Sequence, residues 1–132
     1  MKIENQCVSL ELAKKLKDLG CKQESYFYWI EEENERFGIY GIGDANPKTY
    51  WSVPYISAFT VAELGEMLPA QLHIEVSVQH PVHQFITEKQ FSQWHAVYIC
   101  AGCMGKLGSQ IAHTEADARA AMLVYLLENK LI

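Results

Sequence analysis

The spacing of hydrophobic residues predicts three helices, and the first of them has clear ends. It is expected to begin at Ser9, whose hydroxyl can accept a hydrogen bond from a backbone N–H of the first turn. It is expected to end at Gly20, because glycine readily adopts the left-handed conformation that terminates a helix. The apolar residues that recur at helical spacing between these ends are Leu12, Ala13, Leu16 and Leu19.

A capping box marks the start of the second helix. Thr60 and Glu63 are placed so that each side chain can bond the exposed backbone N–H of the other. Phe59 before the cap and Leu64 within the helix have the spacing of a hydrophobic staple. Because Pro69 cannot continue the hydrogen-bond ladder, this helix is expected to be about two turns long.

The third helix is predicted to begin at Thr114, with Asp117 in the position of a capping box. Glu115 and Arg119 are four residues apart with the acid first, which favours a surface ion pair. Residues 120–127 read AAMLVYLL and are apolar on almost every side, so the helix is either deeply buried or shared with another subunit. Because complete burial is difficult in so small a domain, we expect a homo-oligomer that forms through this C-terminal helix.

Four segments have the residue pattern of strands. Residues 26–31 and 36–40 are aromatic and β-branched, and the polar turn between them predicts a hairpin. Residues 72–79 alternate between apolar and polar positions, and residues 94–101 are expected to pair with them.

The segments that remain are expected to be connections, because residues 80–92 contain Pro81 and residues 102–113 contain three glycines. The predicted order is helix, hairpin, helix, two strands, helix. The sequence therefore indicates an α+β fold, a single domain over residues 1–132 in which helices pack on one face of an antiparallel sheet.

Composition narrows the functional classes. Of the 132 residues, 49% are hydrophobic and 20% are charged, which is typical of a globular protein and argues against disorder. No apolar run approaches the roughly 20 residues that cross a membrane, and the first residues, MKIENQ, lack the apolar core of a secretion signal. We therefore expect a cytoplasmic protein whose cysteines are thiols. The formal charge of −5 has the wrong sign for binding nucleic acid.

A zinc site is the most specific chemistry that the residue spacing suggests. His80-x-x-His83 and Cys100-x-x-Cys103 together supply two imidazoles and two thiolates, which is a tetrahedral zinc ligand set. Two observations argue against it. Cys100 falls on the expected inward face of a strand, where a cysteine commonly serves as a small hydrophobic residue. Pro81 prevents the histidine pair from lying on a helix. No metal or cofactor is therefore predicted, with the zinc site left open as an alternative.

No catalytic arrangement stands out. Gly105 and Lys106 are followed by Leu107 rather than by Ser or Thr, so a Walker-type phosphate loop is absent. Gly41-x-Gly43 lacks the third glycine of a dinucleotide-binding fingerprint. The five histidines favour no particular nucleophile and base. We therefore predict a protein without enzymatic activity, with a small hydrolase as the alternative.

Aromatic residues are concentrated in one part of the chain. Ten of the fifteen lie between Tyr26 and Phe59, and one hairpin cannot cover all of them. Amphipathic rings near basic side chains can stack on a planar ligand and hold its phosphate, or anchor a protein partner. The residues expected to form such a ligand or partner site are Tyr28, Arg36, Lys48, Tyr50, Trp51 and Tyr55.

Three stretches of the chain resemble small phage and prophage proteins from bacterial genomes of the Bacteroidetes type. They are CVSLELAKKLKDLGCKQESYFYW (residues 7–29), YISAFTVAELGEMLP (residues 55–69) and HTEADARAAMLVYLLENKLI (residues 113–132). The family brings no assigned activity, so the resemblance implies only a phage or prophage origin and expression inside a bacterial host.

That origin favours an accessory protein that acts by binding. We expect a counter-defence protein that sequesters a nucleotide-derived signal in an aromatic-lined site between subunits. The alternative is a protein–protein interaction module that inhibits or modulates a host factor.

Overall fold

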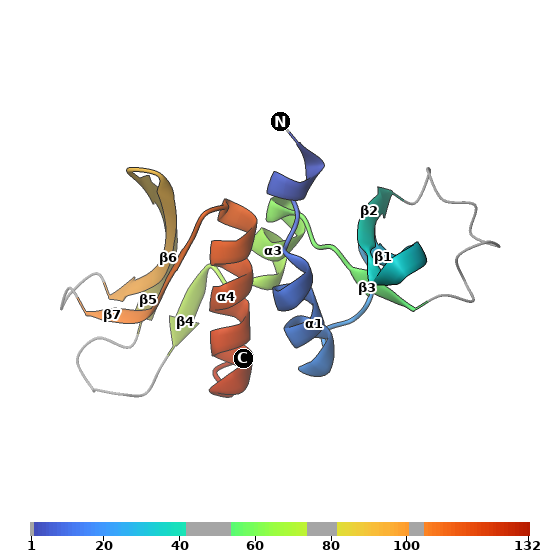
Figure 1. Cartoon of the computed structure of the whole chain (residues 1–132). Coiled ribbons are helices and arrows are strands. Elements are labelled where there is room, and N and C mark those ends of the chain that lie inside the picture. Colours follow the sequence, from blue (N-terminus) through green and yellow to red (C-terminus); the bar gives the residue numbers. More distant parts are fainter. Residues whose placement is uncertain (1, 42–53, 74–81, 101–104) are drawn as a thin grey trace.

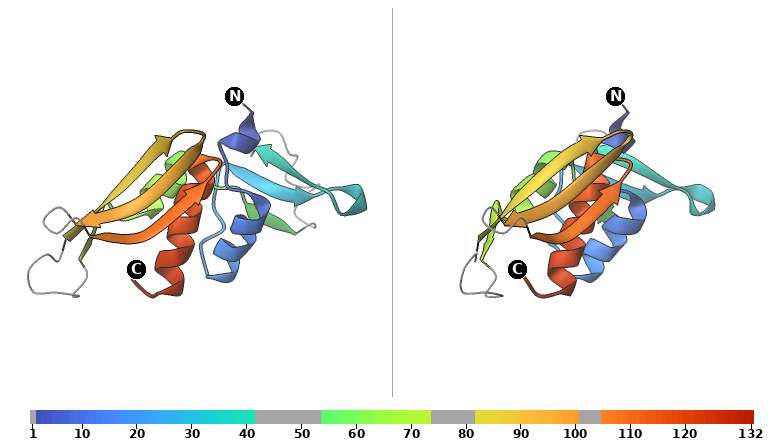
Figure 2. Two further views of the ribbon diagram at one scale, coloured as in Figure 1. Left: turned by 60° about the vertical axis from the view of Figure 1, so that its left-hand side comes forward. Right: turned by 90° about the vertical axis from the view of Figure 1, so that its left-hand side faces the viewer.

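The helices of this protein lie between two antiparallel sheets, as the computed structural model shows (Figures 1 and 2). The structure describes residues 2–41, 54–73, 82–100 and 105–132. The helices are α1 (Leu10–Asp18), α3 (Val61–Met67) and α4 (Glu115–Glu128), with short 3₁₀ turns η1 (Ile3–Asn5) and η2 (Glu33–Glu35). The smaller sheet, in the order β2-β1-β3, contains β1 (Phe27–Glu31), β2 (Phe37–Gly41) and β3 (Tyr55–Ser57). The larger sheet, in the order β4-β5-β6-β7, contains β4 (Gln71–His73), β5 (Val82–Gln90), β6 (Gln93–Cys100) and β7 (Lys106–Ala112).

The α+β class and the antiparallel pairing are confirmed, with the strands divided between two sheets rather than gathered in one. The predicted hairpin is confirmed as β1 and β2. β3 escapes the sequence pattern because it is three residues long, too short to show an alternation. It pairs with β1 and completes the smaller sheet.

Local signals place the helix ends correctly. Thr60 and Glu63 form the predicted capping box, with Thr60 N–H donating to Glu63 Oε2 at 2.8 Å and Glu63 N–H to Thr60 Oγ1 at 3.2 Å. Gly20 has a φ of +90° at the end of α1. Ser9 precedes α1 as expected, but its side chain makes no capping bond. Its backbone N–H instead donates to Asp117 Oδ1 of α4 at 2.7 Å, which joins the starts of α1 and α4.

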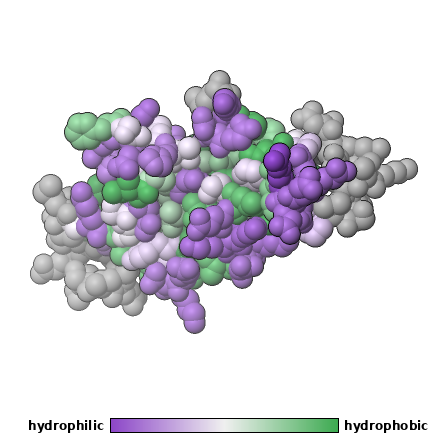
Figure 3. All heavy atoms as spheres, viewed as in Figure 1, coloured by the Kyte–Doolittle hydropathy of each residue, from purple (hydrophilic) through white to green (hydrophobic). Residues whose placement is uncertain are grey.

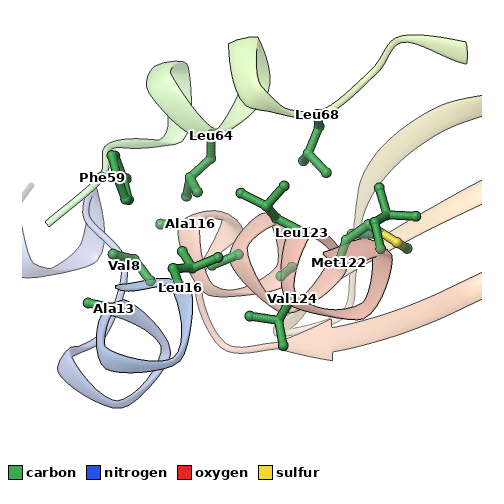
Figure 4. Close-up of a cluster of buried hydrophobic side chains, with 14 of the residues drawn as sticks. Val8, Ala13, Leu16, Phe59, Leu64, Leu68, Ala116, Met122, Leu123 and Val124 are labelled. Atoms are coloured by element: carbon green, nitrogen blue, oxygen red, sulfur yellow. The ribbon is translucent and has the colours of Figure 1, made fainter. Parts of the chain in front are cut away.

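α4 is the centre of the hydrophobic core. It packs against α1 and α3 on one side and against β5, β6 and β7 on the other. No residue from Glu115 to Leu127 is exposed. Figure 4 shows Met122, Leu123 and Val124 among side chains from the neighbouring helices. The expectation that a domain of this size leaves one face of the helix uncovered is therefore wrong, and an oligomer has no exposed face of α4 to use.

Two strands of the larger sheet lie where the sequence predicts connections. β5 occupies most of residues 80–92 and β7 most of residues 102–113, so both predictions are wrong. β6 confirms the strand predicted for residues 94–101. Of the strand predicted for residues 72–79, β4 contains the start, and residues 74–79 lie outside the described residues.

A β-bulge brings β7 close to α4. The register pairs Ala96 with Gln110 and Tyr98 with Leu107, which leaves Gly108 and its successor opposite a single residue of β6. Gly108 has a φ of +66°, a conformation that favours glycine. A Cβ atom here would lie 2.6 Å from the ring of Tyr125. The absence of a side chain therefore allows the sheet to approach the helix.

Candidate functional site

The smaller sheet turns one face toward the helices. The indole Nε1 of Trp29 donates to the carbonyl of Val8 at 2.9 Å, and Ile56 lies in the core. The ammonium of Lys14 on α1 lies 5.0 Å from the centre of the Phe37 ring, within the range of a cation–π contact. Because side chains alternate along a strand, the residues between these ones point away from the helices.

Three tyrosines share the opposite face. Tyr28 of β1 is the direct partner of Tyr40 on β2, and Ile30 is the direct partner of Tyr55 on β3. The rings of Tyr28 and Tyr55 meet edge to face, with centres 5.3 Å apart and planes at 86°. Tyr55 is 45% exposed. Tyr28 and Tyr40 are half-buried, so the three rings share one face of the sheet, with the ring of Tyr55 the most exposed of them.

Charged groups lie at the hairpin end of this surface. The extended backbone of Arg36, directly before β2, places its side chain on the same side as Tyr40, and Arg36 is exposed. The Tyr40 hydroxyl donates to the carboxylate of Glu32. Gly38 lies between Tyr40 and Glu32, and a Cβ atom at Gly38 would collide with the Glu32 carboxylate. We call this surface the tyrosine face, and its residues are Tyr28, Arg36, Tyr40 and Tyr55.

A second carboxylate, that of Glu63, joins the segment before β1 to α3. Glu63 Oε2 accepts hydrogen bonds from the Thr60 backbone, the Thr60 hydroxyl and the Ser25 hydroxyl, and its Oε1 accepts from the Tyr26 N–H at 3.0 Å. The Ser25 N–H in turn donates to the Tyr28 hydroxyl at 3.1 Å. The orientation of the Tyr28 ring is therefore fixed through a chain of hydrogen bonds that begins at the N-terminus of a helix.

A hollow of about 420 Å³ opens beside this connection. Two segments line this hollow: the one that precedes β1, and α3 together with Phe59, which precedes the N-cap residue of α3. The lining residues are Glu24, Ser25, Tyr26, Phe59, Glu63, Glu66 and Met67. Tyr26 is 69% exposed at its edge. This hollow could not be predicted from the sequence, because the two segments that line it are distant along the chain.

The structure places three of the six residues expected to form the binding site on one face of a sheet. Tyr28, Arg36 and Tyr55 share the tyrosine face, while Lys48, Tyr50 and Trp51 lie outside the described residues. Tyr40 was not among the expected site residues. The alternation of the predicted hairpin could have identified it, because Tyr40 and Tyr28 occupy equivalent outward positions on paired strands.

The zinc ligand set is only partly described. His83 and Cys100 are direct partners across β5 and β6, and Cys100 is buried, as its inward position predicts. His80 and Cys103 lie outside the described residues. Within the described ranges, no group of three or more His, Cys, Asp or Glu side chains is placed to hold a metal ion.

Burial of a thiol makes the fold sensitive to alkaline pH. The backbone of Cys7 pairs with that of Thr60 in an isolated antiparallel β-bridge, and Cys7 is 1% exposed. Burial of the thiol is the main cause that raises its pKa from 9.0 to about 11, and the nearby carboxylates of Glu63 and Glu4 raise it further. Burial also raises the pKa of Tyr98 to about 12. In the unfolded chain both groups lose their protons at lower pH than in the folded chain, so raising the pH favours unfolding.

We therefore expect stability to be complete below pH 9 and to fall between pH 9 and 11, by about 2 kcal/mol from Cys7 alone. Urea denaturation at a series of pH values measures this dependence. In Cys7→Ala the free energy of unfolding should fall less steeply with pH, because only the other buried groups, such as Tyr98, still contribute to the decline. An equally steep decline in this variant contradicts the assignment to Cys7.

Comparisons with known proteins add no relative. No family model, curated protein or solved structure matches the chain.

Among the helices of the described residues, none combines the length and hydrophobicity that crossing a membrane requires.

Proposed function

We propose that this protein acts by binding and that the tyrosine face receives a planar, negatively charged ligand such as a nucleotide. The observation that carries the proposal is the presence of Tyr28, Tyr55 and Arg36 on one outward face, with the two rings in contact. Aromatic rings and a guanidinium group are the combination that recognises a base and its phosphate.

In this proposal each side chain has a separate task. Tyr55, which is 45% exposed, offers its ring for stacking, and Tyr28 supports that ring at right angles. Arg36 provides a fork of N–H donors suited to phosphate oxygens. The carboxylate of Glu32, held by the Tyr40 hydroxyl, can accept a hydrogen bond from a ribose hydroxyl. Binding without chemical conversion of the ligand is the activity that we propose.

The resemblance to phage and prophage proteins supplies the biological setting of the proposal. In the cytoplasm of an infected bacterium, a protein that holds a nucleotide-derived signal lowers its free concentration without any catalysis. We propose this counter-defence role for the tyrosine face. The exposed ring of Tyr55 and the exposed side chain of Arg36 on one face of the sheet support it, and no cofactor is part of the proposal.

Ligand binding can be measured directly by isothermal titration calorimetry. Adenosine monophosphate and a cyclic dinucleotide serve as probes, and bound ligand is recovered after denaturation to establish whether it is intact. We expect Tyr55→Ala to raise the dissociation constant about 5- to 100-fold, since one stacked base contributes about 1–3 kcal/mol. Arg36→Gln should weaken binding of the phosphorylated probes and leave adenosine binding unchanged.

Phe91→Ala is the matched control, because it removes a fully exposed aromatic ring from the other sheet. Its affinity for both probes should equal that of the unmodified protein. If neither probe binds, or if Tyr55→Ala and Phe91→Ala bind equally well, the nucleotide proposal fails. Conversion of the probe, rather than its intact return, would favour a hydrolase.

A protein partner is the second candidate for the same surface. Tyrosine and arginine are enriched among the residues that dominate protein interfaces, and Tyr26 and Tyr55 are both exposed. Under this alternative neither nucleotide binds, and one bacterial protein is retained at stoichiometric amount by the unmodified chain and lost with Tyr55→Ala.

A further inference from the structure

The larger sheet has a face that points away from the helices. On β5, the hydroxyl of Thr87 bonds Glu115 of α4 at 3.3 Å, and Arg119 lies over the Phe85 ring at 5.7 Å. These residues therefore mark the inner face. Because side chains alternate, the even-numbered residues of β5 form part of the outer face, and Ile86 is 38% exposed there.

The strand register extends this outer face across β6 and β7. Residues that are direct partners across the strands form rows on this face. The row nearest the β5–β6 hairpin contains Glu88 of β5, His95 of β6 and Ile111 of β7. The middle row contains Ile86 and Val97, and the last row contains Gln84, Ile99 and Lys106 in the same strand order. The apolar residues form a continuous patch, which we call the outer patch and which consists of Ile86, Ile99 and Ile111 around Val97, a residue that its neighbours already bury to 6% exposure. Ile111 is 54% exposed, and hydrophobic residues reach the surface at this end of the molecule in Figure 3.

We propose that a second copy of this chain covers the outer patch, with the strands of the two sheets crossing at about 90°, one of the two usual ways in which sheets pack face to face. The two-fold axis runs between the sheets, along the diagonal from Gln84 to Ile111. It passes over the buried Val97, and it places Ile86 on Ile99 of the second copy and Ile111 on its own equivalent.

Charge complementarity identifies a second copy as the occupant. Glu88 and Lys106 occupy opposite corners of the outer face, and both are exposed. The diagonal axis brings Glu88 of each copy against Lys106 of the other, so two ion pairs flank the outer patch. Within the described part of the chain, neither residue forms a salt bridge. An axis parallel to the strands would instead place Glu88 on Ile111, and burying a carboxylate on an apolar side chain is unfavourable.

The size of the surface sets the expected strength. β5 has nine residues and β6 has eight, but β4 has only three and β7 has seven, so a rectangle about 28 Å long and about 19 Å wide is the upper limit of the area of the four strands. This is about 500 Å² in projection, less than the roughly 800 Å² that each partner contributes to a standard interface. We therefore expect a reversible dimer with a dissociation constant on the order of tens of micromolar.

The hairpin between β5 and β6 extends the contact. Gln90 pairs with Gln93, so Phe91 and its successor form a two-residue turn. Phe91 is fully exposed and has a φ of +57°, which is unusual for a bulky residue. In the proposed dimer this tip passes beyond β7 of the second copy, at the open edge of its sheet.

Exchange of the two charges tests the dimer. Analytical ultracentrifugation over about 10 µM to about 1 mM covers the expected dissociation constant. Glu88→Lys and Lys106→Glu should each raise it at least about tenfold, because each creates two like-charge contacts. A mixture of these two variants should dimerise again, since every contact then joins a lysine to a glutamate, and the double variant should recover for the same reason. Glu33→Lys, on the hairpin of the smaller sheet, makes the same change in net charge as Glu88→Lys and should have no effect.

All of these positions are exposed, so circular dichroism should show each variant to be folded. A chain that remains monomeric up to about 1 mM overturns the proposal. A dimer that neither single variant weakens, or a mixture that associates no better than its separate components, also overturns it, because the contact then lies elsewhere. Loss of self-association leaves the nucleotide test of the tyrosine face unaffected, because that face lies on the other sheet.

Discussion

Replacing Gly108 by alanine is expected to lower the free energy of unfolding by about 3 kcal/mol. Two costs combine at this position. The φ of +66° is unfavourable for a residue with a side chain, and the new Cβ would lie 2.6 Å and 2.7 Å from ring atoms of Tyr125 and 3.1 Å from the sulfur of Met122. Met122 is fully buried, so β7 must move away from α4 to make room.

Gly20→Ala separates these two costs. Gly20 has a φ of +90°, but a Cβ there meets nothing within 4 Å, so only the backbone cost of about 1–2 kcal/mol applies. Urea denaturation followed by tryptophan fluorescence measures both variants. An equal loss of stability in the two variants would show that close contact between β7 and α4 contributes nothing.

Glu63→Ala is expected to cost about 3 kcal/mol, far more than a substitution at a partly exposed position ordinarily does. The carboxylate accepts four hydrogen bonds, which connect the cap of α3 with Ser25 and Tyr26. Removing it leaves backbone donors unpaired in the capping box and beside β1. Hydrogen bonds to a charged acceptor are also stronger than neutral ones.

Two further variants test this interpretation. Glu66→Ala removes an exposed carboxylate from the same helix and the same hollow, and it should change stability by less than about 0.5 kcal/mol. Glu63→Gln keeps one acceptor oxygen and should lie between the two. Thermal unfolding ranks the three, and hydrogen exchange at the Tyr26 amide should accelerate in Glu63→Ala. If Glu63→Ala is no more destabilising than Glu66→Ala, the hydrogen bonds of Glu63 do not stabilise the fold.

Elements with strong local signals were predictable from the sequence. The capping box of Thr60 and Glu63 depends on residues three apart, and Gly20 marks the end of a helix without any distant contact. The hairpin of β1 and β2 is equally local. In each case, the interactions that decide the structure lie within a few neighbouring residues.

Elements that depend on distant contacts were not predictable. In β5, Phe85 points toward the helices and its neighbour Ile86 points away from them. Because both residues are apolar, the sequence does not alternate between apolar and polar residues as a half-buried strand usually does. β7 contains Gly108, which reads as a loop residue until the closeness of α4 is known. α4 is buried because α1 and α3 cover one side of it and the larger sheet covers the other. Of these elements, only β7 is adjacent to α4 along the chain.

The candidate site shows the same division. Outward positions for Tyr28 and Arg36 follow from the hairpin pattern alone. That Tyr55 shares their face requires β3 to pair with β1, and the pairing of a three-residue strand depends on the fold around it. Glu63 was predicted only as a helix cap, and its bonds to Ser25 and Tyr26 became visible once the two segments were placed together.

The central position of α4 affects how a newly made chain acquires its structure. The ribosome synthesises this helix after every other described element, so both sheets emerge before the element around which the core is assembled. Until then, Leu16 and Leu64 lack the apolar surface that later buries them. Folding is therefore tied to the completion of translation through α4, and a chain stalled before Glu115 presents an open core to chaperones and proteases.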